Sequence, residues 1–171
     1  MKITLESLGD TADEMMESLR CSVAGVFHCP VETRARPEGL AWAYNADRKQ
    51  YSSSKLLASL GKSDIQARVV GIADVDLYVP RLNFVFGEAD AVSGTAIVSL
   101  FRLRQEYYGL APDDALLLER ATKEIVHELG HTFGLGHCPN GKCVMHFSNS
   151  LADTDLKGSG FCSDCRPKII L

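Results

Sequence analysis

Residues 127–138 read HELGHTFGLGHC, and this stretch decides how the rest of the chain is interpreted. It ends a run of good helix formers that starts at residue 115, and a proline and two aspartates stand just before that run. Proline suits the first turn of a helix, and aspartates favour the positive end of the helix dipole. The sequence therefore predicts a long helix that begins near Pro112 and ends near Gly134.

Three histidines in this stretch have the spacing of ligands to one metal ion. His127 and His131 are four residues apart, so a helix places them on one face about one turn apart. Gly134 tolerates a positive φ and can turn the chain until His137 supplies a third ligand. Three protein ligands and one open position are typical of a catalytic zinc. Glu128 is then the expected general base, which takes a proton from a metal-activated water that attacks a peptide carbonyl.

A cluster of cysteines follows at once, formed by Cys138, Cys143, Cys162 and Cys165. Two close pairs separated by a loop are the pattern of a closed thiolate site, which holds a structural zinc. Disulfides are the alternative, but the charged start of the chain lacks the apolar core of a secretory signal. We therefore expect a cytoplasmic protein with reduced thiols and two zinc ions per chain, one catalytic and one structural.

The composition excludes several other classes of protein. Apolar residues make up 46% of the 171 residues and charged residues 23%, which is ordinary globular usage. A net charge of −4 gives no general attraction to nucleic acid. The longest apolar runs are interrupted by charges, so no membrane span is expected. We expect a soluble monomer whose partner is a peptide substrate.

Hydrophobic patterning predicts alternating strands and helices before the long helix, which indicates an α/β or α+β fold. The expected strands cover residues 2–8, 31–36, 67–73 and 94–101, and the expected helices cover residues 11–27 and 52–60. A short aromatic strand over residues 83–87 is expected at a sheet edge. The segment after residue 136 has little periodicity and depends on its metal site for order.

The run HELGHTFGLGH, the cysteine that follows it, Met145 and the final CxxC together resemble the archaemetzincins, a family of metzincin peptidases. The stretches YVPRLNFVFGEA and GTAIVSLFRLR are similar to the upstream part of that family. The chain departs from the family's pattern at one point, because the 16 residues between Met145 and Cys162 are one fewer than the pattern has. The ligand set is unaffected by this difference.

The resemblance implies a zincin-like metzincin fold, with a twisted mixed sheet, a backing helix and the long active-site helix. It assigns the three histidines and Glu128 to a catalytic zinc, the four cysteines to a structural zinc, and Met145 to a Met-turn beneath the catalytic ligands. The whole chain, residues 1–171, is then one metallopeptidase domain. Residues 1–136 form the sheet and active-site helix, and residues 137–171 form the Met-turn and zinc-stabilised C-terminal part.

Folds of this kind place an edge strand beside the substrate. Phe84, Val85 and Phe86 are therefore candidates to bind an extended peptide by main-chain hydrogen bonds. Glu88 and Asp90 are candidates to hold the α-amine that an aminopeptidase requires. The choice between endopeptidase and aminopeptidase stays open.

The metal-binding pattern leaves two alternatives to a metzincin peptidase, one of them another class of zinc peptidase. A gluzincin needs a glutamate ligand farther along the chain, but no glutamate follows Glu128. A zinc-stabilised peptide-binding module with little catalysis remains the alternative. The sequence pattern assigns no role to four other cysteines and histidines, which are Cys21, Cys29, His28 and His146.

Overall fold

The computed structural model describes residues 1–64 and 66–169. Its strands are β1 (Lys2–Leu8), β2 (Val31–Arg36), β3 (Tyr44–Asn45), β4 (Gln50–Ser52), β5 (Ala67–Ala73), β6 (Leu77–Tyr78), β7 (Gly87–Asp90) and β8 (Thr95–Ser99). Its α-helices are α1 (Asp13–Phe27), α2 (Ser53–Ser59), α3 (Asp114–Thr132) and α4 (Leu151–Leu156). Short 3-10 helices cover Ala41–Ala43, Gln105–Tyr108 and Arg166–Lys168.

The main sheet has five strands in the order β2-β1-β5-β8-β7. The first four strands are parallel, whereas β7 runs antiparallel to β8 at one edge. β1 and β8 are buried along nearly their whole length, as expected for strands that are covered on both faces. The predicted mixed sheet and the strands over residues 2–8, 31–36 and 67–73 are thus confirmed.

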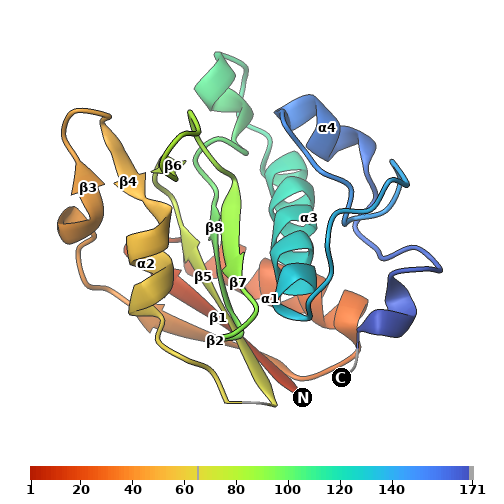
Figure 1. The fold of residues 1–171 in the computed structure, drawn as a ribbon. Coiled ribbons are helices and arrows are strands. Elements are labelled where there is room, and N and C mark those ends of the chain that lie inside the picture. Colours follow the sequence, from red (N-terminus) through yellow and green to blue (C-terminus); the bar gives the residue numbers. More distant parts are fainter. Residues whose placement is uncertain (65, 170–171) are drawn as a thin grey trace.

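Helices cover both faces of this sheet, which lies between α2 and α3 (Figure 1). One hydrophobic cluster joins β1, α1 and α3 to the C-terminal segment, residues 137–169, and reaches Met145 and Cys165. A smaller cluster lies on the other face, where Leu56 and Leu57 of α2 pack near Ile97 of β8. The sheet therefore holds α3 on the same face as the C-terminal segment.

The strand expected over residues 83–87 is wrong, because the edge strand begins at Gly87. Aromatic residues favour strands, but the main chain before Gly87 bonds in several directions. The Val85 N–H donates to the Leu77 carbonyl, whereas the Phe86 carbonyl accepts from the Ser99 N–H. The side chains of Arg48 and of Gln50 in β4 also donate to the main-chain carbonyls of residues 82 and 83, so a regular ladder cannot form here.

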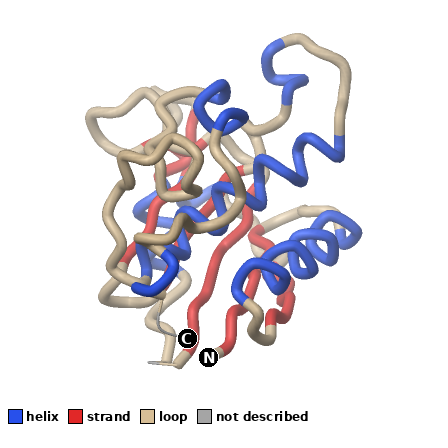
Figure 2. The backbone as a smooth tube through the Cα atoms, turned by 90° about the vertical axis from the view of Figure 1, so that its right-hand side faces the viewer, coloured by secondary structure: helices blue, strands red, loops and turns tan. Residues whose placement is uncertain are grey.

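A second sheet, with strand order β3-β4-β6, was not predicted. Its strands contain only two or three residues, too few to produce a recognisable alternation. Most of the C-terminal segment is loop, as expected, and Figure 2 shows these loops on the face turned to the viewer. The short helix α4 within it begins with a capping box between Ser150 and Asp153.

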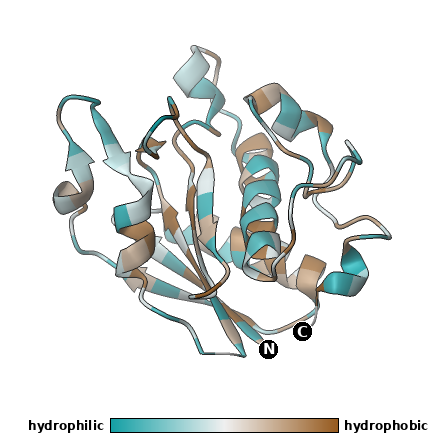
Figure 3. Cartoon of the chain, viewed as in Figure 1, coloured by the Kyte–Doolittle hydropathy of each residue, from teal (hydrophilic) through white to brown (hydrophobic). Residues whose placement is uncertain are grey.

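Helix α3 buries polar side chains as well as apolar ones, and Figure 3 shows alternating hydrophobic and hydrophilic bands along it. Arg120 makes a bidentate ion pair with Asp155 near the C-terminal end of α4. Lys123 donates to the main-chain carbonyls of Thr154 and Asp155. Because these contacts satisfy the buried charges, α4 docks firmly against the helix that carries the histidines.

Candidate metal centres and active-site cleft

The side chains of the three predicted histidines converge, two from α3 and one from the loop after it. Their ligand atoms all lie within 4.8 Å of one another. The Nδ1 atoms of His127 and His131 lie 2.7 Å and 2.8 Å from the carbonyl oxygens of Val144 and Leu135. An Nδ1–H that donates to a carbonyl leaves the lone pair on Nε2, which is the form that binds a metal.

The spacing of these nitrogens fits a shared zinc ion. The two Nε2 atoms of His127 and His131 are 3.1 Å apart. Two nitrogen ligands on one tetrahedral zinc, at about 2.05 Å from it, lie roughly 3.3 Å from each other. The histidines are therefore already arranged for this metal.

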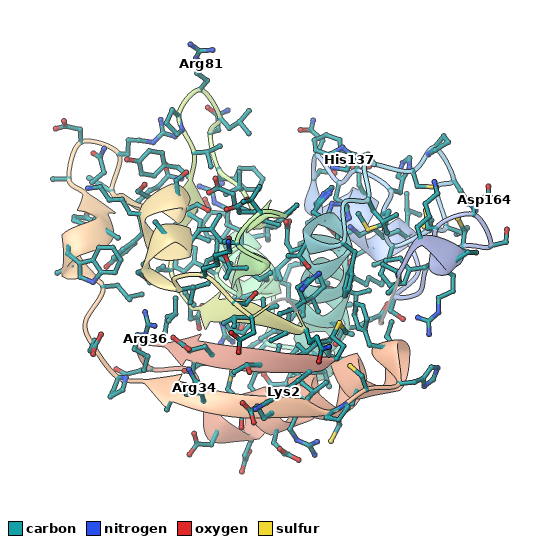
Figure 4. The ribbon with its side chains drawn as sticks, turned by 60° about the horizontal axis from the view of Figure 1, so that its bottom comes forward. Lys2, Arg34, Arg36, Arg81, His137 and Asp164 are labelled. Carbon is teal, nitrogen blue, oxygen red and sulfur yellow. The ribbon has the colours of Figure 1, made fainter. Side chains whose placement is uncertain are left out.

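The chain turns after α3 as the sequence predicted. Gly134 has φ +82°, and its N–H donates to the His131 carbonyl. The chain then returns so that exposed His137 reaches the other two histidines, and its ring lies 4.9 Å from the ring of Phe147. Figure 4 labels His137 in the loop beyond α3. The third histidine thus lies on the solvent-exposed side of the cluster, in the lining of the cleft.

Burial keeps the histidines in their metal-binding state. Burial, assisted by the nearby positive charge of Lys157, lowers the pKa of His127 to about 3. Burial also lowers the pKa of His137, and His131 adds to this effect. Both imidazoles are therefore neutral at pH 7, so the metal does not have to displace protons from them.

The four cysteines form a second cluster, with their sulfur atoms within 4.8 Å of one another. The Sγ atoms of Cys138 and Cys162 are 3.8 Å apart, and all four thiols are free. Two thiolates on one tetrahedral zinc, at about 2.3 Å from it, are separated by roughly 3.8 Å, whereas a disulfide requires about 2.05 Å. The cluster fits a four-thiolate zinc site and does not fit disulfides.

The thiols differ in their tendency to ionise. Burial raises the pKa values of Cys143 and Cys165. The backbone N–H groups of Asp164 and Cys165 lower the pKa of Cys162 to about 7. A bound cation would stabilise the ionised form of all four thiols. We therefore expect ionisation of this cluster to depend on a metal, whereas the histidines bind a metal in their neutral form.

Residues 143–146 form a tight turn beneath the histidines, which we call the Met-turn. The His146 N–H donates to the Cys143 carbonyl, and the Cys138 N–H donates to the Met145 carbonyl at 2.9 Å. Met145 is fully buried, and its sulfur takes the place that a Cβ would occupy on Gly130 of α3. A glycine between the two helical histidines therefore lets the Met-turn approach the helix.

Glu128 lies in the wall of the cleft and is only 7% exposed. Burial raises the pKa of Glu128 well above its usual range, and the neighbouring carboxylates of Glu124 and Glu88 raise it further. Lys157 acts in the opposite direction. A carboxyl group with a raised pKa binds a proton more tightly than an exposed one, which suits a group that accepts a proton and later returns it.

The cleft beside the histidines has a volume of about 550 Å³. Phe84, Val85 and Phe86 line it, as do residues 87–89 of β7. Glu88 also lines the cleft, where its carboxylate accepts a hydrogen bond from Ser54. Asp90 is not among the lining residues, and its side chain accepts from the Val92 N–H in the turn before β8.

Comparison with known proteins agrees with this geometry. The sequence model of peptidase family M54 matches residues 3–170. The chain belongs to this family, the archaemetzincins. It is therefore a zinc metallopeptidase by class.

Archaemetzincins from two archaea illustrate the similarity in sequence. The one from Methanocaldococcus jannaschii is 42% identical over 169 residues, which are 99% of this chain and 93% of that protein. The one from Pyrococcus horikoshii is 52% identical over 131 residues, which are 75% of this chain and 70% of that protein. The family assignment thus covers nearly the whole chain.

Solved structures of the family have the same fold. A zinc-dependent peptidase from Methanocorpusculum labreanum matches with a TM-score of 0.88 and 30% identity, covering 98% of this chain and all of that one. An archaemetzincin from Archaeoglobus fulgidus, complexed with malonate, matches with a TM-score of 0.86 and 39% identity, covering 99% and 100%. The expected zincin-like architecture is confirmed by these structures.

Several cleft residues of this family member were not predicted. Glu124 lies one helical turn before Glu128 on the same face of α3, so helical periodicity could have identified it. Phe147, Ser148 and Asn149 follow the Met-turn and also line the cleft. Nothing in their local pattern indicates this, because the path of the chain after the turn decides it.

The residues left without a role lie outside this cleft. His28 ends α1 in a left-handed conformation with φ 55°. Cys21 is exposed on α1, and Cys29 is half-buried. The Nδ1 atom of His146 lies 2.9 Å from the Cys138 carbonyl, so this histidine braces the Met-turn. Among the helices within residues 1–64 and 66–169, none has the length and apolar character that a membrane span requires.

Proposed function

We propose that this chain hydrolyses peptide bonds with two zinc ions, a catalytic one on His127, His131 and His137 and a structural one on the four cysteines. The observation that carries the proposal is the convergence of three imidazoles beside a buried carboxyl group, Glu128, in one cleft. A zinc ion on the histidines supplies a Lewis acid that lowers the pKa of bound water to about 7.

Glu128 acts as the general base. Its carboxylate takes a proton from the attacking water and later gives that proton to the leaving amine. The raised pKa of Glu128 favours holding the proton between these two steps. The carbonyls of Val144 and Leu135 keep two imidazole rings aimed at the metal position throughout.

The substrate lies extended along β7. This strand is the last of the main sheet, and its residues line the cleft. An edge strand offers main-chain hydrogen bonds to a peptide of any sequence. Phe84, Val85 and Phe86 also line the cleft, and we propose that their side chains contact the substrate while β7 supplies the main-chain bonds.

The decisive experiment measures zinc content and peptide cleavage together. Glu128→Gln should retain two zinc ions and lose activity by about 10²- to 10⁴-fold, because it removes only the base. His131→Ala should retain one zinc ion and lose cleavage. Full cleavage by Glu128→Gln would exclude the general-base role. One zinc ion in the unaltered protein with no cleavage of a peptide library would favour a peptide-binding module instead.

Three further proposals concern the whole chain. Residues 1–171 act as one metallopeptidase domain, since a single core cluster includes residues of β1, α3 and the C-terminal segment. Its reduced thiol cluster suits the cytoplasm. We also propose that the protein is a monomer, and sedimentation equilibrium at several concentrations tests this.

A further inference from the structure

Gly87, the first residue of β7, lies directly against Glu128. A Cβ atom built on Gly87 would lie 2.7 Å from Cγ of Glu128 and 2.8 Å from its Oε1. The same Cβ would lie 2.8 Å from the main-chain oxygen of Ile97 in β8. Real Cβ atoms do not approach other heavy atoms this closely, so no residue with a side chain fits here unchanged.

The carboxyl group of Glu128 is held by packing against its neighbours. Within the part of the chain that the structure describes, no hydrogen bond or ion pair to this carboxyl group is found. The side chain is nevertheless nearly buried. Its position therefore depends on packing, and the nearest wall is the main chain at Gly87.

We propose that Gly87 is a positioning residue for the general base, an inference that rests on the proposed function. The missing side chain leaves the space that Glu128 fills, and β7 then limits where the carboxyl group can lie. The strand that offers its edge to the peptide thus also sets the position of the group that activates the attacking water.

A methyl group at position 87 can be accommodated only if the Glu128 side chain moves. On one side it meets the Ile97 carbonyl, which belongs to a strand buried along its whole length. On the other side it meets the Glu128 side chain, which can rotate. We therefore expect Gly87→Ala to displace Glu128 while the sheet and both metal clusters remain.

The kinetic test compares two Gly→Ala variants of the zinc-loaded protein. Gly87→Ala should lower kcat by about 10²-fold with little change in KM, because a displacement of the base by about 1 Å reduces the rate by about this factor. The control is Gly71→Ala in β5, where the three atoms nearest to a Cβ are the flexible ends of the Leu8, Leu60 and Ile97 side chains. Gly71→Ala should lower the unfolding midpoint in urea without changing kcat. Equal kcat values for the two variants would overturn the proposal.

A stability cycle tests the contact without using activity. Gly87→Ala should lower the urea midpoint more in the unaltered protein than in Glu128→Ala, where the partner of the clash is absent. An equal shift in both backgrounds, or failure of both Gly87→Ala proteins to fold, would overturn the proposal. Activity loss in Glu128→Gln with normal kcat in Gly87→Ala would reject this inference alone. Full activity in Glu128→Gln would reject the proposed function.

Discussion

The two ligand clusters of this protein are built in opposite ways, although they share a boundary between His137 and Cys138. Two histidines lie on α3, and their rings are held by hydrogen bonds to main-chain carbonyls, one of which belongs to the Met-turn. All four cysteines lie in loops or turns. The histidine cluster is thus positioned largely by secondary structure, whereas we expect the cysteine cluster to depend on its proposed zinc, and this difference predicts how each responds to damage.

The largest effect is expected for loss of the thiolate site. Cys165→Ser removes one ligand of a site whose metal binding contributes about 10 kcal/mol in small zinc domains, an amount comparable to the stability of a whole domain. We expect the C-terminal segment to unfold and cleavage to fall with it, because Cys138 adjoins a histidine ligand. Elemental analysis and resistance to proteolysis measure the outcome.

The matched control for this variant is Cys21→Ser, which changes an exposed cysteine on α1. It should leave zinc content, proteolysis and cleavage unaltered. His131→Ala should also keep the fold, because secondary structure positions its neighbours. If Cys165→Ser kept two zinc ions and resisted proteolysis, the contrast between the clusters would be lost.

A buried ion pair connects the two regions and gives the next largest effect. Lys157, which is fully buried, lies 3.0 Å from the Glu124 carboxylate on α3 and 3.5 Å from the His146 carbonyl in the Met-turn. Lys157→Met leaves that carboxylate buried without its cation, which costs about 3–5 kcal/mol. Urea unfolding measures the free energy. The double variant with Glu124→Leu should recover part of the loss, and a larger loss in the double variant would contradict this account.

The smallest predicted effect is a difference in the pH dependence of metal affinity. The raised pKa values of Cys143 and Cys165 keep these thiols protonated at pH 7, so zinc must displace their protons. Affinity of the cysteine cluster should therefore rise from pH 6 to pH 8. His127, with its pKa lowered to about 3, is already neutral throughout this range and adds no such slope.

Calorimetry in buffers of different ionisation enthalpy measures the protons that are released. His131→Ala isolates the cysteine cluster for this experiment, and the unaltered protein with its thiolate site already loaded isolates the histidine cluster. Equal proton release by the two clusters would contradict this difference in ionisation.

How much of this molecule the sequence predicts depends on the range of the interactions involved. The convergence of the three histidines was predictable because helical geometry and a short turn decide their spacing, and so were Gly134 and the parallel strands. The path of residues 82–86 was not, since it depends on bonds to side chains more than 30 residues away. The closeness of Gly87 and Glu128 is of the same kind, because sheet order decides it and no local pattern records it.

The main sheet has two open edges, and the chain treats them differently. β2 forms the outer edge opposite β7, and charged residues occupy it. Glu32 pairs with Lys2, and Arg36 pairs with Glu6. Figure 4 labels Lys2, Arg34 and Arg36 on β1 and β2. Charged side chains along an edge strand disfavour the addition of a strand from another molecule, so this edge resists aggregation. The remaining edge, β7, lines the cleft, so the same open main chain that β2 protects with charges is left available there for the proposed extended substrate.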